Sequence, residues 1–288
     1  MTVVIKDSFD MLSAGPMALS KQGALSVLLY ADDTLIIGAS QSGVQELLDV
    51  IAEVGLRFGM ELHWDKFQLL EVNAHYSIKT PTGEVIQPSE VMSYLGANMY
   101  ADGAIRSELN KKLGAAWAEF CKLQKVWNHS SLTMGRKVQI YQAVVVSRLL
   151  YGLSSAWLNV AESRRLNGFH ARCLRKVTGI KPSFISRVSN AAVLKKAGQA
   201  ELRCQLLRQQ LLMYGRLARA SNDDVLRQLT FIPDSTRPAT GRYVRRVGRP
   251  RNEWAVMLEK ETRKMHTDPS TIINDHFLWR RAVVAYCV

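Results

Sequence analysis

Three features of common protein classes are missing from this sequence. Its four cysteines stand far apart with no C-x-x-C spacing, which argues against a zinc site and favours reduced thiols. The N-terminal segment MTVVIKDSFDML has no apolar stretch long enough for a signal peptide, and no later apolar run approaches the length of a membrane span. We therefore expect a soluble intracellular protein, nuclear or cytoplasmic, that does not associate with membranes.

Acidic residues are scarce in the second half of the chain. The net charge is +13, but residues 1–159 hold 13 Lys and Arg against 15 Asp and Glu, a balance of −2. Residues 160–288 hold 25 against 10, a balance of +15. Such a half suits a polyanion such as RNA or DNA, which basic side chains bind through phosphate contacts with release of counterions. Charge alone leaves open the alternative of a solvated basic helical surface.

An aspartate pair lies inside an apolar run, LLYADDTLIIG, at residues 28–38. Carboxylates are costly to bury without a partner. Asp32 and Asp33 therefore either lie in a solvent-exposed hairpin turn without a function or form a metal site at that turn. The run suits two short strands joined at Tyr30-Ala31-Asp32-Asp33. A turn flanked by buried strands would hold the two aspartates rigidly.

The next segments predict one helix and several short strands. Ser42 and Gln45 have capping-box spacing, and Gly59 ends the helix that follows. The apolar residues of this helix share one face: Val44, Leu47, Leu48, Ile51 and Gly55.

Three further segments favour strands before the pattern changes. MELHWDKFQLLEV has strand character, YSIKTPTGEVIQP alternates around Thr82-Gly83 like a hairpin, and EVMSYLGANMY reads as one short strand. Asp102-Gly103 forms a turn, and the chain beyond it is almost wholly helical. The expected helices are Ala104–Trp127, Gly135–Leu158, Glu162–Val177, Ala191–Ala220 and Glu253–His266.

These segments together resemble the reverse transcriptases of non-LTR (LINE-type) retrotransposons. LLYADDTLIIG resembles their Y-x-D-D strand-turn-strand, LRFGMELHWDKFQLL occupies the place of G-L-x-x-N-x-x-K-T, and VMSYLGANM resembles the primer-grip hairpin. KVQIYQAVVVSRLLYGLSSAWL and RLNGFHARCLRKVTGI resemble the helices after the palm. MYGRLARA and VGRPRNEWAVML resemble the C-terminal G-H-x-x-R and G-R-P-x-x-x-W signatures, so the likeness runs from roughly residue 1 to 260.

The resemblance implies RNA-directed DNA synthesis by two-metal nucleotidyl transfer, with Mg²⁺, an RNA template, a DNA primer and deoxynucleoside triphosphates. It implies Asp32 as the direct metal ligand, with Asp33 tuning charge or position beside it. Lys66 would lie near the leaving pyrophosphate, where an ammonium can stabilise charge or donate a proton. The implied primer grip is Tyr94-Leu95-Gly96. Each of these residues also has a structural alternative, as a surface lysine or an ordinary strand end.

The sequence departs from the family pattern at several points. His63 stands where the family prefers Asn, Phe67 where it prefers Thr, and Arg216 where it prefers His. Only 29 residues precede Tyr30, too few for the first palm carboxylate and the fingers. We therefore expect the C-terminal part of a reverse transcriptase, with an incomplete metal site and no polymerase activity alone. Intron-encoded maturases also carry Y-A-D-D, but the later motifs favour LINE elements.

A basic segment, GRYVRRVGRPRNEW, separates the last helix from those before it. Arginines interleaved with Gly and Pro suit an extended arm that binds phosphates, and its tyrosine could stack on a base. The predicted nucleic-acid-binding residues are Arg242, Tyr243, Arg245, Arg246, Arg249 and Arg251. A nuclear-localisation signal would fit the same residues.

We assign the fold class as α+β. Residues 1–103 are expected to form a partial palm of short antiparallel strands plus helices, 104–220 a helical thumb-like region, and 221–288 a basic arm with C-terminal helices. Two alternatives to a polymerase remain open: a non-catalytic nucleic-acid-binding module, and an inert fragment of a decayed element.

Overall fold

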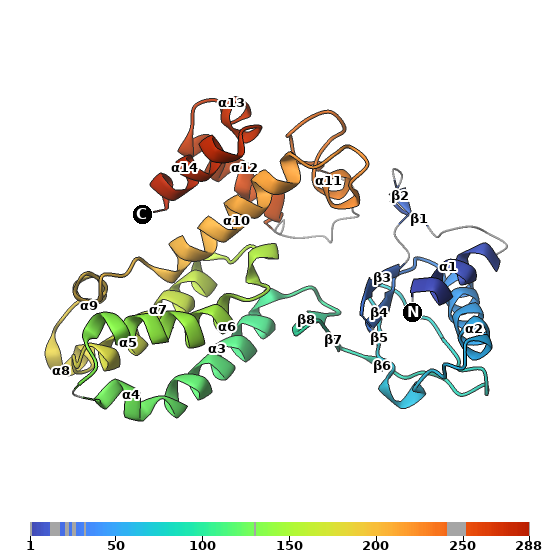
Figure 1. Ribbon diagram of the computed structural model, residues 1–288, viewed down its shortest axis with the longest axis horizontal. Coiled ribbons are helices and arrows are strands. Elements are labelled where there is room, and N and C mark those ends of the chain that lie inside the picture. Colours follow the sequence, from blue (N-terminus) through green and yellow to red (C-terminus); the bar gives the residue numbers. More distant parts are fainter. Residues whose placement is uncertain are drawn as a thin grey trace. The chain divides into compact units, whose positions relative to one another are not determined.

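The computed structural model describes residues 2–11, 18–20, 23–24, 27–31, 33–129, 131–240 and 252–287. The chain divides into two compact units, unit 1 (Met1–Ala104) and unit 2 (Ile105–Val288) (Figure 1). Within the described ranges all strands belong to unit 1, and unit 2 is built from helices. The fold class is α+β, as the sequence predicts. The assignment of palm, thumb and arm to the three predicted segments stays a prediction.

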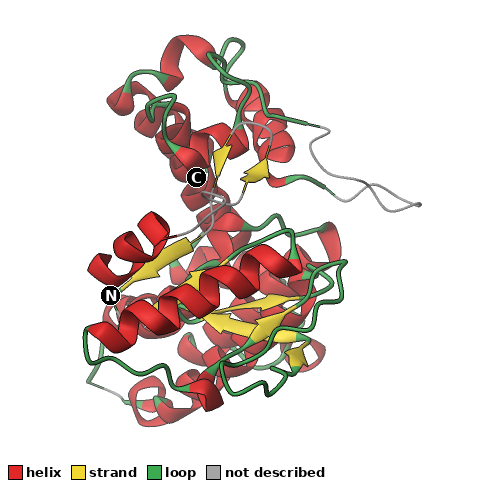
Figure 2. Cartoon of the chain, turned by 90° about the vertical axis from the view of Figure 1, so that its right-hand side faces the viewer, coloured by secondary structure: helices red, strands yellow, loops and turns green. Residues whose placement is uncertain are grey.

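Unit 1 contains two long helices and four two-stranded sheets, with helices and strands distinguished in Figure 2. Its elements are α1 (Thr2–Met11), β1 (Ala18–Ser20), β2 (Gly23–Ala24), β3 (Val27–Tyr30), β4 (Asp33–Ile36), α2 (Gln41–Arg57), the 3₁₀ turn Trp64–Lys66, β5 (Leu69–Leu70), β6 (Pro88–Ser89), β7 (Val91–Tyr94) and β8 (Ala97–Tyr100).

The core of unit 1 is small. Ile5 of α1 packs with Leu47 and Ile51 of α2, and Val27 and Ile36 at the open end of the β3–β4 hairpin pack against them. The predicted apolar face of α2 is confirmed in its centre, and Gly59 follows the helix with φ 69°, a left-handed conformation that glycine adopts at low cost.

The start of α2 differs from the prediction. Ser40, not Ser42, is the N-cap, because its side chain accepts a hydrogen bond from the Gly43 amide at 3.2 Å. Gln45 has a different partner: its amide group donates to the Lys79 carbonyl and accepts from the Lys79 amide, both at 2.8 Å. Gln45 therefore ties α2 to a loop 34 residues away rather than closing the helix end.

The strand predicted over MELHWDKFQLLEV is mostly wrong. Only Leu69–Leu70 forms a strand, and it pairs with Pro88–Ser89 in parallel. Trp64–Lys66 forms a 3₁₀ turn, in which the Trp64 and Phe67 rings stack with centroids 4.7 Å apart. Three-residue spacing brings such rings together on a tight helical turn, whereas a strand would put them on opposite faces.

The last part of unit 1 holds two tight turns. Thr82-Gly83 is a turn as expected, closed by a bridge between Lys79 and Val85, with Gly83 at φ 87°. Residues 91–100 form a hairpin, β7–β8, so the single strand expected from the residue pattern is wrong, while the hairpin implied by the family resemblance is present. Leu95 and Gly96 both have positive φ, 49° and 74°, which matches the right-handed twist of the paired strands.

Unit 2 contains twelve α-helices together with one π-helical and one 3₁₀ segment among its described residues. Its elements are α3 (Ile105–Lys122), α4 (Gln124–Asn128), α5 (Met134–Ile140), the π-helix Tyr141–Val146, α6 (Ser147–Leu150), the 3₁₀ turn Leu153–Ser155, α7 (Val160–Val177), α8 (Ser183–Ser186), α9 (Asn190–Ala197), α10 (Leu202–Ala218), α11 (Val225–Thr230), α12 (Trp254–Met265), α13 (Ser270–Ile273) and α14 (His276–Tyr286).

Several predicted helices are interrupted. The Ala104–Trp127 helix breaks at Leu123, where the chain turns so that the buried Trp127 ring donates its N–H to the Phe120 carbonyl at 2.8 Å. The Ala191–Ala220 helix breaks at Gly198, which has φ 62°. The Gly135–Leu158 helix passes through a π-helical segment and ends before Gly152, at φ 73°.

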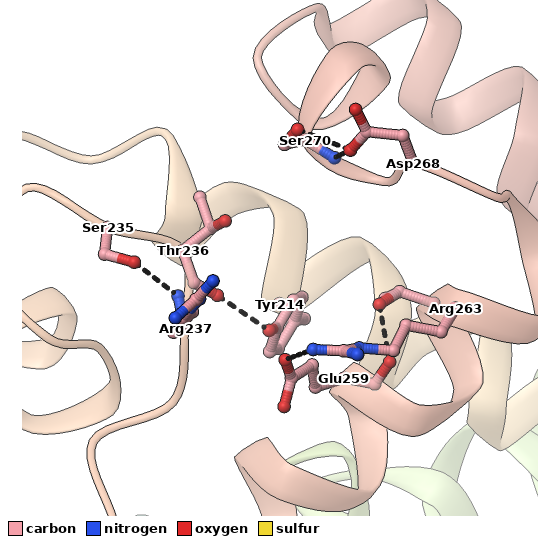
Figure 3. Close-up of polar contacts among 9 residues, drawn as sticks. Tyr214, Ser235, Thr236, Arg237, Glu259, Arg263, Asp268 and Ser270 are labelled. Atoms are coloured by element: carbon pink, nitrogen blue, oxygen red, sulfur yellow. Dashed lines mark hydrogen bonds and ion pairs between the residues drawn. The ribbon is translucent and has the colours of Figure 1, made fainter.

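Unit 2 has two apolar clusters. The first gathers side chains from α3 to the start of α10. The second surrounds the C-terminal part of α10 and contains Tyr214, whose hydroxyl donates to the Thr236 carbonyl at 3.3 Å (Figure 3). On α12 beside Tyr214, Arg263 forms an ion pair with Glu259 at 2.7 Å. Burial raises the pKa of Tyr214 well above its usual value, so this hydroxyl stays a hydrogen-bond donor.

Two of the predicted C-terminal motifs meet in this second cluster. The Trp254 ring N–H donates to the Ser154 carbonyl at 2.8 Å, which joins the start of α12 to the 3₁₀ turn Leu153–Ser155. Gly215 lies against the buried Trp279 ring, and Arg219 donates to the Ile273 carbonyl at 2.7 Å. Gly215 and Arg219 therefore pack α10 against the α13–α14 segment, which gives the G-x-x-x-R pair a structural role.

Candidate functional site

The predicted hairpin around the aspartate pair is present. Strands β3 and β4 pair antiparallel, with Leu29 opposite Thr34 and Tyr30 opposite Asp33. Ala31 follows β3 as a turn residue with φ 54°, and β4 begins at Asp33. Asp32 itself lies outside the described residues. Asp33 begins β4 at the turn and is exposed.

The turn end of the hairpin is not flanked by buried side chains, and the expectation of two buried strands is wrong there. Leu28, Leu29 and Tyr30 are 38%, 37% and 64% exposed, while Val27 at the other end packs on the core of unit 1. A two-stranded sheet offers only one face to the α1–α2 pair, so the part of the hairpin beyond that pair stays open. The aspartate turn therefore projects from the small core.

Asp33 has the donor chemistry that Mg²⁺ prefers. Mg²⁺ is commonly held through one or two carboxylates together with substrate phosphates. Across the described ranges, no group of three or more His, Cys, Asp or Glu side chains is placed to hold a metal ion. The roles of Asp32 and Asp33 as metal ligands stay a prediction.

The segment predicted to be the primer grip is hydrogen-bonded to the aspartate hairpin, and its role stays a prediction. The Tyr94 hydroxyl, on β7, donates to the Leu28 carbonyl on β3 at 3.4 Å. The neighbouring Ser93 amide donates to the Gln68 side chain at 2.9 Å. Leu95 and Gly96 form the exposed turn that follows Tyr94. Hydrogen bonds thus connect the aspartate hairpin, the Tyr94 hairpin and the segment that carries Lys66, although 66 residues separate Leu28 from Tyr94.

Lys66 is the last residue of the 3₁₀ turn Trp64–Lys66 and is exposed. It is two residues from Gln68, which binds β7. The turn, held by the Trp64–Phe67 stack, directs the chain from α2 to β5. Its role at a leaving group stays a prediction.

The predicted arginine arm lies outside the described residues. This applies to the whole predicted set: Arg242, Tyr243, Arg245, Arg246, Arg249 and Arg251. Their role in binding nucleic acid stays a prediction.

Sequence reasoning missed a second basic region, at α7–α9. Residues 163–200 contain nine Lys and Arg and no Asp or Glu. Within this region Phe184 and Ile185 of α8 are 79% and 55% exposed. The absence of Asp and Glu from residues 163–200 could have been noticed in the sequence. The exposed helix α8 could not, because four residues make only one turn and show no helical periodicity.

A buried polar network in unit 2 has no catalytic geometry. The Tyr141 hydroxyl lies 2.9 Å from His170 Nδ1, and His170 Nε2 lies 3.1 Å from the Ala200 carbonyl. Burial lowers the pKa of His170 to about 4 and raises the pKa of the neighbouring Cys173 thiol to about 12. At neutral pH both groups are uncharged, so His170 links α7 to the segment before α10, and burial disfavours the thiolate form that a nucleophilic cysteine needs.

Comparison with known proteins relates part of the chain to a transposon. No protein-family model and no solved structure matches it. Over 163 residues the chain is 26% identical to a transposon-derived protein of Caenorhabditis elegans, a match that covers 54% of this chain and 57% of that protein. The chain therefore spans less than two thirds of that relative's length. Among the described residues, no helix is long and apolar enough to cross a membrane.

Proposed function

We propose that this chain is part of a LINE-type retrotransposon reverse transcriptase, an RNA-directed DNA polymerase. The observation that carries the proposal is the hydrogen-bonded arrangement of three motifs in unit 1. Tyr94 binds the strand that leads into the aspartate turn, and Ser93 binds Gln68 beside Lys66. These are the motifs in which the sequence resembles that family, and they occur in the family's order. The similarity to a transposon-derived protein supports the same origin.

In this proposal different residues of unit 1 bind the metal, the leaving group and the primer. Asp32 and Asp33 would hold Mg²⁺, which when bound activates the primer hydroxyl and neutralises triphosphate charge. Lys66 would balance charge on the leaving pyrophosphate. The Leu95-Gly96 turn, with its positive φ angles, would bring backbone close to the primer end. RNA template, DNA primer and deoxynucleoside triphosphates are the proposed partners.

A second candidate is a nucleic-acid-binding module without catalysis. It is favoured by the charge balance of +15 in residues 160–288, because such a surface binds phosphates whether or not unit 1 binds a metal. Both candidates require nucleic-acid binding, and an inert fragment of a decayed element does not.

Salt dependence of binding tests this shared requirement. The whole chain should bind a fluorescent RNA template annealed to a DNA primer, with an affinity that falls steeply as salt rises. Replacing Arg245, Arg246 and Arg249 with alanine should weaken binding on all sequences alike. It should also flatten the log–log salt slope by about two units, at roughly 0.7 counterions per phosphate contact on single-stranded segments. Fluorescence anisotropy measures both quantities.

A matched control removes three charges that already have partners. Arg57, Arg148 and Arg263 form ion pairs with Glu53, Glu119 and Glu259. Replacing these three arginines with alanine changes the net charge equally and should leave the slope nearly unchanged. A folded chain that binds no primer–template at low salt would contradict both candidate functions and favour the decayed element.

A further inference from the structure

The α8 surface, defined as Lys181, Phe184, Ile185 and Arg187, combines exposed apolar and basic side chains. Phe184 is 79% exposed and Ile185 55% exposed, and both basic residues are exposed as well. Helix α8 lies in the loop between α7 and α9 (Figure 1). Single exposed apolar residues are common on protein surfaces, but Phe184 and Ile185 are adjacent in the chain and have the basic residues Lys181 and Arg187 on either side in the sequence, a combination of apolar and polar groups that is typical of interaction sites.

The loop that carries this surface is rigidly held. The buried Arg175 guanidinium donates to the Lys181 carbonyl at 3.3 Å, to the Val188 carbonyl at 2.7 Å and to the Asn190 side chain at 2.9 Å. The Ser186 hydroxyl closes the loop internally by donating to the Lys181 carbonyl at 3.0 Å. One buried side chain therefore fixes both ends of the loop, so that little ordering cost remains when a ligand binds.

The chain segment that carries the surface is basic and contains no acidic residue. Nine Lys and Arg and no acid occur in residues 163–200. The acids at the two borders are engaged: Glu162 caps α7 by accepting from the Asn159 amide at 2.7 Å, and Glu201 accepts from the Asn167 side chain at 2.6 Å. Residues 163–200 therefore offer a ligand at α8 basic side chains and no carboxylate.

We propose that the α8 surface binds single-stranded RNA, with Phe184 stacking on an unpaired base while Lys181 and Arg187 contact the flanking phosphates. The inference deepens the proposed function, because it rests on the chain binding nucleic acid and names a place where it does so. An exposed ring between cations matches the alternation of base and phosphate along a single strand. A double-stranded ligand is a poorer match, because its bases are already stacked on one another and cannot stack on the Phe184 ring. A protein partner is also a poorer match, because the centres of protein–protein interfaces are depleted in lysine.

The test is fluorescence anisotropy of the whole chain with a labelled single-stranded RNA and with the same RNA annealed to its complement. Phe184→Ala should weaken single-strand binding by about tenfold or more, without changing the salt slope, because stacking releases no counterions. Lys181→Ala with Arg187→Ala should lower the slope by about 1.4, at roughly 0.7 per phosphate contact. The affinity for the duplex should change little on Phe184→Ala.

Phe277→Ala is the matched control. Phe277 of α14 is 81% exposed, but residues 268–281 balance two arginines with two aspartates. This variant should bind single-stranded RNA as the unchanged chain does, and circular dichroism should show all variants folded.

The outcomes separate this inference from the proposed function. A chain that binds RNA but is unaffected by Phe184→Ala overturns the α8 inference and leaves the proposed function intact. Equal weakening of single-strand and duplex binding also overturns the stacking role. A chain that self-associates in sedimentation and becomes monomeric on Phe184→Ala, with unchanged RNA affinity, would assign the surface to a second copy instead. Loss of all binding at low salt in the unchanged chain contradicts the proposed function itself.

Discussion

Replacing Gly215 with alanine should lower the free energy of unfolding of unit 2 by about 3 kcal/mol, as expected for overpacking of a rigid site. A Cβ at this position would lie 2.2 Å from Nε1 and 2.5 Å from Cδ1 of the Trp279 ring. That ring is fully buried, and its N–H donates to the Leu211 carbonyl at 3.0 Å. The ring cannot move aside without losing this hydrogen bond and its packing, so α10 and α14 must separate.

Urea unfolding followed by circular dichroism measures the effect. Gly168→Ala is the control, because Gly168 is exposed within α7 and no atom lies within 4 Å of an added Cβ. That change should stabilise the chain by up to about 1 kcal/mol through helix propensity. Trp279→Phe combined with Gly215→Ala should recover part of the loss, since the smaller ring leaves room. If Gly215→Ala proved as stable as the unchanged chain, the close approach of α10 to Trp279 would be wrong.

Acidification should destabilise unit 2 through His170. Burial lowers the pKa of His170 in the folded chain to about 4, below the ordinary value of 6.5. As pH falls below 6.5, His170 becomes protonated in the unfolded chain but stays neutral in the folded chain. Protonation therefore favours the unfolded chain, and the free energy of unfolding decreases between pH 6.5 and pH 4. Below pH 4 the folded histidine protonates as well, and the loss levels off. The full effect is about 3 kcal/mol, at roughly 1.36 kcal/mol per pKa unit.

Urea unfolding at intervals from pH 7.5 to pH 4 tests this. His170→Gln should flatten the curve between pH 6.5 and pH 4, because the amide keeps hydrogen-bonding capacity but does not titrate. The exposed His129 provides the control, and His129→Gln should leave the slope unchanged. Parallel curves for His170→Gln and the unchanged chain would show that His170 is not the titrating group.

Local signals account for much of what the sequence predicted correctly. The aspartate hairpin is readable because β-formers flank a short turn. The long helix α7 is readable from its periodicity, although it begins at Val160, two residues before the predicted start, after the capping box of Asn159 and Glu162. The Asp102-Gly103 turn before α3 also follows from residue type, with Gly103 at φ 62°.

The missed features depend on contacts between distant residues. The helix breaks at Leu123, where the Trp127 ring N–H donates to the Phe120 carbonyl. No Gly or Pro marks this break in the sequence. The contact of Tyr94 with Leu28 crosses 66 residues, so the grouping of the site motifs could not be derived from spacing. The exposure of the hairpin beyond Val27 depends on how little of it the α1–α2 pair covers, and an apolar sequence alone predicts burial instead.

The central claim is that the aspartate turn is the metal site of a polymerase. Mn²⁺ accepts the same oxygen ligands as Mg²⁺ and broadens the nuclear magnetic resonance signals of nearby nuclei. With the whole chain, RNA template, DNA primer and a deoxynucleoside triphosphate, low Mn²⁺ should selectively broaden the amide signals of Ala31, Asp33 and Thr34. Asp32→Asn with Asp33→Asn should abolish that broadening.

The sequence contains its own control, Tyr100-Ala101-Asp102, which repeats Tyr-Ala-Asp at an exposed turn outside the predicted site. We expect Mn²⁺ to broaden the signals of residues 31–34 and to spare those of Asp102 and Gly103, while primer–template binding survives the double asparagine change. Equal broadening at the two turns, or none at residues 31–34 with primer–template bound, would contradict the metal assignment and leave nucleic-acid binding without catalysis as the function.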